Sequence, residues 1–192
     1  MNLKPEQIEK FLTQRPRKEL DQPNLMHAGV LILLFHKDAE LHVLLTKRSS
    51  DVEHHRGQIS FPGGAVDDDD ADIVATAVRE TEEEIGIPAP LIKVLGLFDD
   101  TWTPSGFRIT PVIGYSETRP ETRPSPIEVE QVLEVPLSFF LDPRNERVKQ
   151  LVRGGAPVDV YFYTYGGRSE IWGATAAMLR SLVRALGSIK SG

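Results

Sequence analysis

The sequence predicts an α/β (α+β) fold in which helices pack on a mixed β-sheet. Residues 29–35 form a continuous apolar run of strand length. Residues 72–85 and 174–186 carry apolar side chains at helical spacing, and segments of strand character lie between them. The order of these strands and helices predicts the mixed architecture.

The first 27 residues are expected to form a helix and an arm that precede the main domain at 28–192. Residues 3–15 place Leu3, Ile8, Phe11 and Leu12 on one helix face, and Pro16 ends the helix. The polar stretch up to residue 27 is interpreted as a linker or as an arm that wraps the domain. We therefore expect a single domain with one additional terminal helix.

The remaining elements are expected to be short strands joined by turns. A hairpin is predicted between strands at 29–35 and 41–46, and the helix at 72–85 is expected to end at Gly86. Further strands are predicted at 94–98, 109–115, 132–136 and 158–165, with loops at 102–106 and 117–126 and a brief helical segment at 136–141.

Composition and charge exclude several function classes. The 192 residues carry a net charge of −6, whereas a general nucleic-acid-binding protein needs a basic face. No apolar run approaches the roughly 20 residues of a membrane span, and the N-terminus does not resemble a secretory signal. The absence of cysteine excludes disulfides and thiolate metal sites. We therefore expect a cytoplasmic protein that binds neither membranes nor nucleic acid.

Three glutamates share one face of the helix at 72–85. Glu80, Glu83 and Glu84 fall within an arc of about 100°, are expected to look outward together, and lie near the negative end of the helix dipole. Such a face can be merely solvated, which is the usual meaning of a glutamate run. Because these acids follow a Gly-Gly turn and destabilise the helix end, we predict a bound cation. Mg²⁺ fits best, since it prefers carboxylate oxygens and shares its shell with substrate phosphates.

The same residues resemble the Nudix box, a glycine followed by a helix with the pattern R-E-hydrophobic-x-E-E-x-G-hydrophobic. The matching residues are Gly64, Arg79, Glu80, Glu83, Glu84, Gly86 and Ile87, with Thr81 in the hydrophobic slot. The resemblance implies a Nudix-type α/β/α sandwich with a loop–helix–loop catalytic motif and Mg²⁺ or Mn²⁺ as cofactor. No glutamate stands at the first acid position of the box, and Asp70 and Asp72 are interpreted as helix caps.

A second set of segments resembles the coenzyme A pyrophosphatase branch of that family. The segments are Leu-Leu-Thr-Lys-Arg-Ser at 44–49, Gly57, and Phe-Pro-Gly-Gly at 61–64, and the likeness runs from about residue 28 to 178. A longer gap between the glycine, here Gly64, and the Arg-Glu pair is also typical of this branch. The implied reaction splits coenzyme A into 4′-phosphopantetheine and adenosine 3′,5′-bisphosphate. Glu53 departs from the branch, which has arginine at that position.

The site candidates follow from the motif and its flanking segments. Glu80, Glu83 and Glu84 are expected to bind metal, and they are grouped with Arg79 and Glu128 as catalytic residues, Glu128 as general base or additional ligand. Trp172 is interpreted as a core residue rather than a base-stacking platform. The candidates for substrate binding are Arg48, Arg56, Gly63, Gly64 and Ser105, although Ser105 also suits a turn and Arg48 a salt bridge to a helix carboxylate.

Three functions remain open on the sequence. The first is the coenzyme A pyrophosphatase, and the second is a Nudix hydrolase of ADP-ribose, a dinucleotide or a nucleoside triphosphate. The third is a non-catalytic Nudix-fold module that binds nucleotides. The intact Arg79-Glu80 and Glu83-Glu84 pairs favour the enzymes, because a module without catalysis need not keep clustered like charges. The first helix and arm could also form a homodimer contact.

Overall fold

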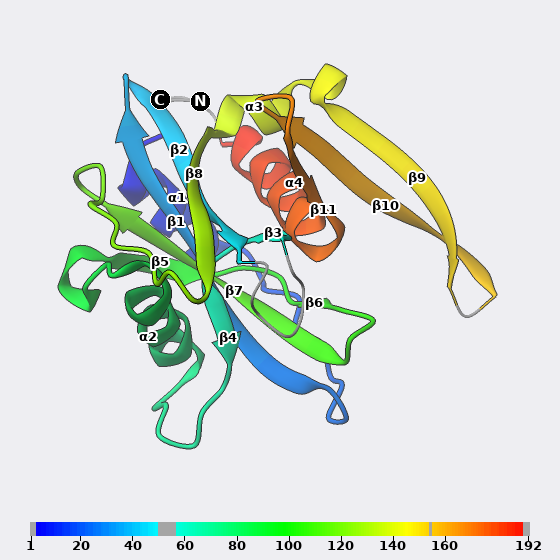
Figure 1. The fold of residues 1–192 in the computed structure, drawn as a ribbon, viewed down its shortest axis with the longest axis horizontal. Coiled ribbons are helices and arrows are strands. Elements are labelled where there is room, and N and C mark those ends of the chain that lie inside the picture. The colour runs from blue at the N-terminus through cyan, green and yellow to red at the C-terminus, as the bar shows by residue number, and fades with distance from the viewer. Residues whose placement is uncertain (1–2, 50–56, 154, 190–192) are drawn as a thin grey trace.

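A computed structural model describes residues 3–49, 57–153 and 155–189, and it confirms the α+β fold with a mixed sheet (Figure 1). None of the helices in these ranges is long and apolar enough to cross a membrane. The helices are α1 (Pro5–Gln14), α2 (Ile73–Ile85), α3 (Leu137–Leu141) and α4 (Gly173–Gly187), with the 3-10 turns η1 (Ala89–Leu91) and η2 (Pro143–Asn145). The strands are β1 (Met26–Lys37), β2 (Glu40–Arg48), β3 (Ile59–Ser60), β4 (Gly63–Ala65), β5 (Lys93–Leu97), β6 (Thr101–Trp102), β7 (Phe107–Ser116), β8 (Val129–Pro136), β9 (Glu146–Arg153), β10 (Ala156–Tyr165) and β11 (Ser169–Trp172).

The main sheet is mixed because its central pairing is parallel. The strands lie in the order β3-β2-β1-β7-β5, and β4, β6 and β8 pair with β1, β7 and β2. β1 runs parallel to β7, from Met26 opposite Phe107 to Phe35 opposite Ser116. β2 pairs with β1 near their hairpin and with β3 further along, while the other half of β1 pairs with β4. The segment from β3 to β4 therefore bridges the two strands where they diverge, and it carries the glycine turn.

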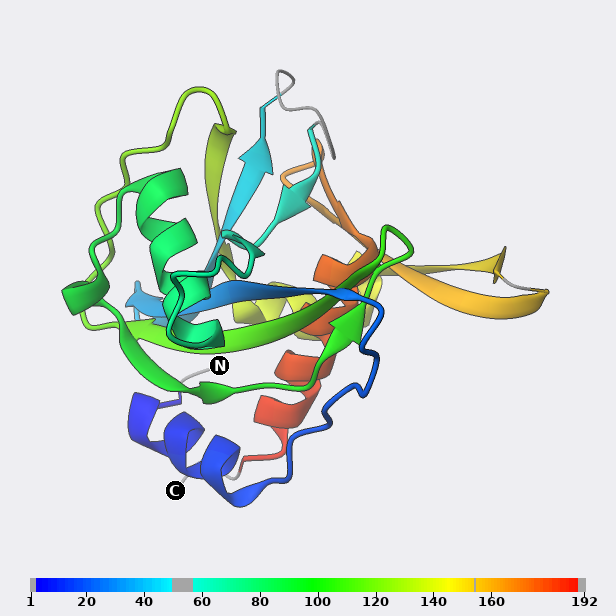
Figure 2. The ribbon, with the colours of Figure 1, turned by 90° about the horizontal axis from the view of Figure 1, so that it is seen from below.

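Helices cover both faces of the main sheet, as in an α/β/α sandwich (Figure 2). Leu31 and Leu33 of β1 pack in a cluster with α2. Ile32 and Leu34 face the other way and pack in a larger cluster with α1 and α4. Burial of both faces explains why β1 is continuously apolar, since a strand with one solvated face would alternate.

A second, three-stranded sheet packs on α3 and α4 and extends away from the molecule. β10 lies between β9 and β11, and its Tyr163 is buried against the rings of Phe139 and Phe140. The Arg180 guanidinium of α4 lies 4.1 Å from the ring centroid of Tyr161. The far end of the β9–β10 hairpin projects beyond the rest of the molecule (Figures 1 and 2).

The strands on either side of the first hairpin are longer than the apolar runs that predict them. β1 and β2 continue until Lys37 pairs with Glu40. Between these residues Asp38 and Ala39 adopt φ values of 51° and 59°. Two consecutive residues at positive φ are the mark of a type I′ turn, whose twist matches that of the flanking strands. The predicted hairpin is therefore confirmed.

Candidate active site

The turn before α2 lies against the acidic helix because its glycines carry no side chains. Gly63 has φ 149°, and a Cβ there would stand 2.3 Å from the carbonyl oxygen of Gly29. A Cβ on Gly64 would stand 2.5 Å from Cδ of Glu80. Neither position can accept a side chain unless its neighbours move. Gly64 thus allows the backbone to approach the Glu80 carboxylate closely, and Gly63 allows the same turn to approach β1.

The helix begins and ends where the sequence predicts. Asp72 is the N-cap, and its carboxylate accepts a hydrogen bond of 2.8 Å from the backbone N–H of Ala75. Gly86 follows the last turn in the left-handed conformation, with φ 69°. These caps fix the register of α2, and so they fix which side chains face the glycine turn.

The loop at 117–126 closes the C-terminal end of α2. The N–H of Arg123 donates to the carbonyl of Ile85 at 2.7 Å, and the N–H of Ser125 donates to the carbonyl of Glu84 at 2.8 Å. These bonds satisfy carbonyls that a helix end leaves without a partner. They also bring Glu128, a few residues further along, to the end of the helix that carries the acids.

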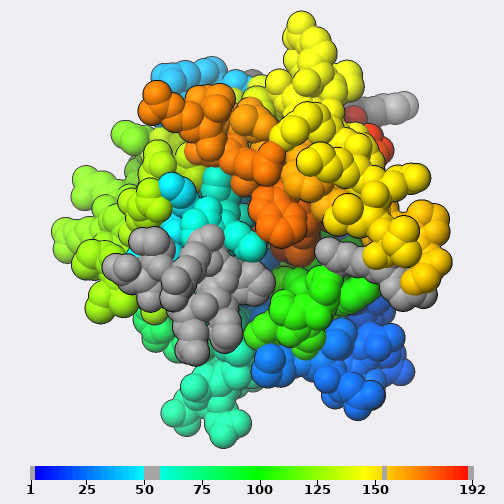
Figure 3. All heavy atoms as spheres, turned by 45° about the vertical axis from the view of Figure 1, so that its right-hand side comes forward, coloured from blue at the N-terminus to red at the C-terminus, as the bar shows by residue number. Residues whose placement is uncertain are grey.

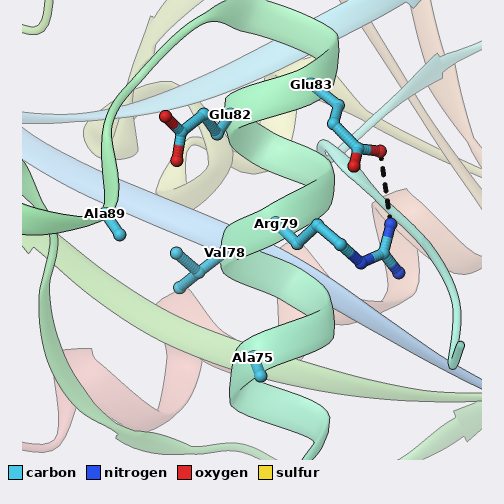
Figure 4. A pocket seen from close by; sticks show the side chains of 6 residues that line it. All are labelled: Ala75, Val78, Arg79, Glu82, Glu83 and Ala89. Carbon is cyan, nitrogen blue, oxygen red and sulfur yellow. Dashed lines mark hydrogen bonds and ion pairs between the residues drawn. The ribbon is translucent and has the colours of Figure 1, made fainter. Parts of the chain in front are cut away.

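Arg79 joins the loop before α2 to two of the glutamates. Its Nε and Nη2 each donate to the Asp70 carboxylate at 2.9 Å. Its Nη1 donates to Glu80 at 2.7 Å. The same Nη1 donates to Glu83 at 3.2 Å (Figure 4). The hydrogen bonds from Arg79 lower the pKa of the Asp70 carboxyl well below its usual range. Asp70 therefore anchors Arg79, and the helix N-cap is Asp72 alone.

Glu84 is a buried carboxylate, whereas Glu83 is exposed. Glu84 is 4% exposed, and burial raises its pKa to about 8. Arg48, whose Nη1 lies 3.6 Å from Oε1 of Glu84, opposes this rise, while Glu80 and Glu128 add to it. The expectation that all three helix glutamates look outward together is wrong for Glu84. The Glu84 carboxylate instead faces Arg48 and the Gly63 backbone, contacts that an isolated helix does not have.

Glu80 belongs to the same electrostatic cluster. Burial raises the pKa of Glu80, Arg79 opposes the rise, and the carboxylates of Glu83 and Glu128 add to it. Glu128 thus acts on both Glu80 and Glu84 although it lies on a separate segment. The site concentrates negative charge around two partly or fully buried carboxylates.

The donor set of this cluster fits a hard divalent cation. Within the described part of the chain, no three His, Asp or Glu side chains are arranged as a metal-binding group, and Arg79 bridges Glu80 and Glu83. The donors are nevertheless carboxylate oxygens, which Mg²⁺ and Mn²⁺ prefer. Glu84 and Glu80 are also held next to like charges, which a cation would neutralise.

Besides Gly63 and Gly64, the candidates for substrate binding lie in different places. Arg48 reaches the acid cluster, and its buried Nε has no hydrogen-bond partner among the described residues. Ser105 lies in the exposed turn between β6 and β7, where its hydroxyl is 2.9 Å from that of Thr103, and no hydrogen bond between described residues joins it to the acids. Arg56 lies outside the described residues, as does Glu53.

A cavity of about 400 Å³ lies on the outer side of α2, beside the acid cluster (Figure 4). Figure 4 shows the Glu83 carboxylate turned toward Arg79 and the Glu82 carboxylate turned away from it. Glu80 and Glu84 do not line this cavity. The lining residues are Ala75, Val78, Arg79, Glu82, Glu83 and Ala89.

Two contributors to the site cannot be identified from the sequence. Asp70 reads as one acid in a solvated acidic loop, and its nine-residue separation from Arg79 follows no helical or strand period. Ser125 reads as part of a polar loop, although its backbone bonds the end of α2. Aligned homologues could reveal Asp70 as an acid paired with Arg79, whereas a backbone contact leaves no such signal.

Comparison with known proteins identifies the family. Residues 25–151 match the NUDIX domain. The chain belongs to the Nudix hydrolase family. A protein of Photorhabdus laumondii described as an uncharacterized Nudix hydrolase, NudL, is 37% identical over 169 residues, which are 88% of this chain and 89% of the relative. A NudL of an Enterobacter species is 35% identical over 180 residues, which are 94% of this chain and 93% of the relative.

Solved Nudix structures share the fold. A Nudix hydrolase of M. smegmatis, RenU, superposes with a TM-score of 0.58 at 19% identity, over 87% of this chain and 89% of that one. An Ap4A hydrolase of C. elegans superposes with a TM-score of 0.56 at 14% identity, over 85% of this chain and 96% of that one. At these identities the likeness concerns the fold alone, and it confirms the expected Nudix architecture.

Proposed function

We propose that this Nudix hydrolase cleaves the diphosphate of a nucleotide derivative and that coenzyme A is its principal substrate. The observation that carries the hydrolysis is the acid cluster of α2, in which Arg79 pairs with Glu80 and Glu83, Arg48 lies against Glu84, and Gly64 closely approaches Glu80. Support for coenzyme A comes from the segments at 44–49 and 61–64, which resemble the coenzyme A branch of the family.

Glu80, Glu83 and Glu84 would hold Mg²⁺ or Mn²⁺. When bound, the cation neutralises phosphate charge and lowers the pKa of the attacking water. Arg79 keeps Glu80 and Glu83 in register with the glycine turn, because its guanidinium is itself fixed by Asp70. The protein thus supplies a preorganised set of carboxylates rather than flexible ones.

Glu128 and Arg48 would act on the substrate itself. Glu128 accepts a proton from water as the water oxygen forms a bond to phosphorus and the bridging P–O bond breaks. Arg48 binds a phosphate oxygen, since its buried Nε has no partner among the described residues and guanidinium groups bind phosphate strongly. For coenzyme A the products are 4′-phosphopantetheine and adenosine 3′,5′-bisphosphate.

A substrate panel tests this proposal. Coenzyme A, ADP-ribose, a dinucleoside polyphosphate and a nucleoside triphosphate are compared in Mg²⁺ and in Mn²⁺ by kcat/KM. We expect coenzyme A to exceed the others by about tenfold or more, the scale that one matched recognition group provides. Turnover of coenzyme A no better than that of ADP-ribose would reject it as the principal substrate. No turnover of any diphosphate would favour the non-catalytic module.

One observation favours a Nudix hydrolase of another nucleotide. Glu53 stands where the coenzyme A branch has arginine, and a carboxylate repels phosphate. If coenzyme A is nevertheless the substrate, Glu53→Arg should lower its KM and leave kcat almost unchanged. An unchanged KM for coenzyme A together with a changed KM for another nucleotide would support the second function.

A further inference from the structure

The outer face of the second sheet carries an aromatic pair and two cations instead of ordinary solvated side chains. Phe162 of β10 pairs directly with Trp172 of β11 and with Arg147 of β9, so the three side chains lie in one row on one face. Tyr161 and Tyr163 point to the opposite face, which packs on α3 and α4. Phe162 and Trp172 are both partly exposed, so Trp172 is not the core residue that its sequence context suggests.

The rings and cations are arranged as a shelf, by which we mean Arg147, Lys149, Phe162 and Trp172. The two rings are nearly parallel, with an interplanar angle of 10° and centroids 6.1 Å apart. The Lys149 Nζ lies 5.0 Å from the Phe162 centroid and forms no ion pair with a carboxylate of the described residues. Arg147, by contrast, is bound to Glu170 at 2.6 Å. Lys149 is therefore the cation of the shelf that is available to an anion.

The shelf lies close to the acidic site. β11 packs against β3, and β3 leads directly into the glycine turn that contacts Glu80. Ser60 and Gly64 are four residues apart, so at most roughly 14 Å of chain separates them. Figure 3 shows the surface of β11 (orange) between β3 (cyan), the β6–β7 turn (green) and the β9–β10 hairpin (yellow). In a nucleotide-linked diphosphate with its phosphates at the acid cluster, the nucleoside is the part that would reach from that cluster to the shelf.

We propose that the shelf binds the nucleotide end of the substrate. The base stacks on the rings of Phe162 and Trp172, and Lys149 binds a phosphate of the same nucleotide. Aromatic side chains on the exposed face of a sheet bind bases in this way because every base has a flat π-face. The assignment rests on the proposed function, since it presumes that the substrate contains a nucleotide.

The charge of the shelf fits one nucleotide rather than a nucleic-acid strand. Binding of a strand depends on many cations along its phosphates. The shelf offers Lys149 together with an Arg147 already paired to Glu170, in a chain of net charge −6. A single base with one or two phosphates matches this supply of positive charge.

Tryptophan fluorescence tests the shelf without any turnover. Trp102 and Trp172 are the two tryptophans, so Trp102→Phe leaves Trp172 as the reporter. The full-length Trp102→Phe protein is titrated with adenosine 3′,5′-bisphosphate in the absence of metal and excited at a wavelength that adenine does not absorb. We expect saturable quenching, and we expect adenosine without phosphate to bind more weakly. Absence of saturable quenching would overturn the proposal.

Lys149→Gln and Lys10→Gln in the same background form a matched pair of variants. Both remove one positive charge from an exposed lysine, but Lys10 lies on α1. We expect Lys149→Gln to weaken the nucleotide about fivefold or more, in the range of one lost base or phosphate contact, and Lys10→Gln to have no effect. If the two aromatic rings serve only to stabilise the sheet, both variants would bind equally well, and the proposal would fail.

Steady-state kinetics separates the shelf from the proposed chemistry. Lys149→Gln should raise KM for the substrate that the panel identifies and leave kcat nearly unchanged, because Lys149 does not touch the acid cluster. Normal turnover with an unchanged KM would reject nucleotide binding by the shelf and leave the proposed hydrolase function standing. Saturable quenching in a protein that hydrolyses no diphosphate would support nucleotide binding by the shelf and reject the proposed hydrolysis. Tighter binding of an oligonucleotide than of the mononucleotide would replace this proposal with a nucleic-acid surface.

Discussion

Arg79 contacts more carboxylates than its single charge can neutralise. It binds Asp70 with two donors and shares the third with Glu80 and Glu83. A planar guanidinium fixes the direction of each of these bonds, which lysine would not do. Asp70 therefore acts as a positioning residue: it holds the guanidinium, and the guanidinium orients two of the proposed metal ligands.

Asp70→Asn should weaken catalysis without unfolding the protein. The Asn side chain is neutral and has one acceptor oxygen, so it cannot bind both Arg79 donors as the carboxylate does. Glu80 and Glu83 therefore lose their fixed orientation. We expect kcat to fall about tenfold or more, on the scale of losing a partner that orients ligands, with the metal dependence shifted to higher Mg²⁺. Asp68→Asn is the control, because Asp68 is an exposed acid of the same loop. Equal effects of the two variants would contradict the positioning role.

Glu83→Gln and Glu84→Gln should separate activity from stability. Each substitution removes a proposed metal ligand, and we expect kcat to fall about a hundredfold or more. Thermal stability should stay the same or rise, because Glu83→Gln removes a like charge from the cluster and Glu84→Gln replaces a carboxyl that burial keeps protonated near neutral pH. Glu82→Gln is the control, since Glu82 is exposed and its carboxylate is turned away from Arg79 (Figure 4). Retained activity in both test variants would contradict the metal site.

The buried Glu84 should also make metal-free stability depend on pH. Its pKa is raised from 4.5 to about 8, so between these values the folded protein holds a proton that the unfolded chain releases. The free energy of unfolding is therefore expected to fall as pH rises from about 4.5 to about 8, by on the order of a few kcal/mol. Chemical denaturation at several pH values in EDTA measures this fall. Glu84→Gln should flatten the profile, and an unchanged profile would contradict the assignment to Glu84.

Residue spacing predicts the local features of the site well, but it does not predict contacts between segments that are distant in the sequence. The helical period identifies Val74, Val78, Thr81 and Ile85 as the packed face of α2, and the structure confirms it. The residue types at the two helix ends predict the caps at Asp72 and Gly86, and both are found there. The buried Glu84 carboxylate contacts Arg48 and the Gly63 backbone, which lie outside α2, and no local pattern in the helix indicates these contacts.

At the scale of elements, β4 and α2 work as one unit. Gly64 of β4 leaves room for the Glu80 carboxylate, and Gly63 leaves room for β1 behind it. α2 has little freedom to move away, because Asp72, Gly86 and the loop at 117–126 fix both of its ends. The geometry of the site therefore depends on backbone contacts that a single added methyl group can disturb.

Gly64→Ala tests that dependence. The new Cβ would meet the Glu80 carboxylate at 2.5 Å, so Glu80 must move away from the turn. We expect kcat/KM to fall about tenfold or more, as for a misplaced catalytic group, and the melting temperature to change little. Gly187→Ala is the control, because an added Cβ there meets nothing within 4 Å. Normal activity of Gly64→Ala would show that the Glu80 position is not critical.

Element prediction succeeds where burial leaves a pattern in the sequence. β1, β2, β7 and α4 carry long apolar runs or helical periodicity, and each is found close to its predicted place. The sequence does not predict β9, because adjacent polar residues at Lys149 and Gln150 break the alternation and the apolar Val148, Leu151 and Val152 are themselves exposed. β11 is too short, at four residues, to show alternation.

At the scale of the whole molecule, the chain is held together by pairings between distant segments. β1 and β7 pair in parallel over ten residues although about eighty residues separate them in the sequence. Sequence patterns predict that both strands exist and that they are buried, but they do not identify the partner of each strand. The same limit applies to the N-terminal arm, whose contacts include residues 99, 100, 108 and 110.

The arm should contribute measurably to stability through Asp100. Its carboxylate is fully buried and accepts hydrogen bonds from Arg17 at 2.7 Å, Thr110 at 2.8 Å and the N–H of Leu20 at 3.0 Å. Burial acts to raise the pKa of Asp100, but these bonds outweigh it and hold the pKa below its usual range. Protonation at acid pH should therefore weaken the arm, and stability should fall as pH falls through that lowered pKa.

Asp100→Ala leaves Arg17 and the Leu20 N–H without their buried acceptor. We expect the free energy of unfolding to fall by about 3–5 kcal/mol, the range for breaking one side of a buried pair. Urea denaturation measures it as a lower midpoint with an unchanged slope. Asp21→Ala, at an exposed arm residue, should have almost no effect.

Because Asp100 lies on the α4 side of the main sheet and the acid cluster on the α2 side, kcat per folded molecule should be retained. A stable Asp100→Ala variant would mean that the arm is not clamped by this carboxylate.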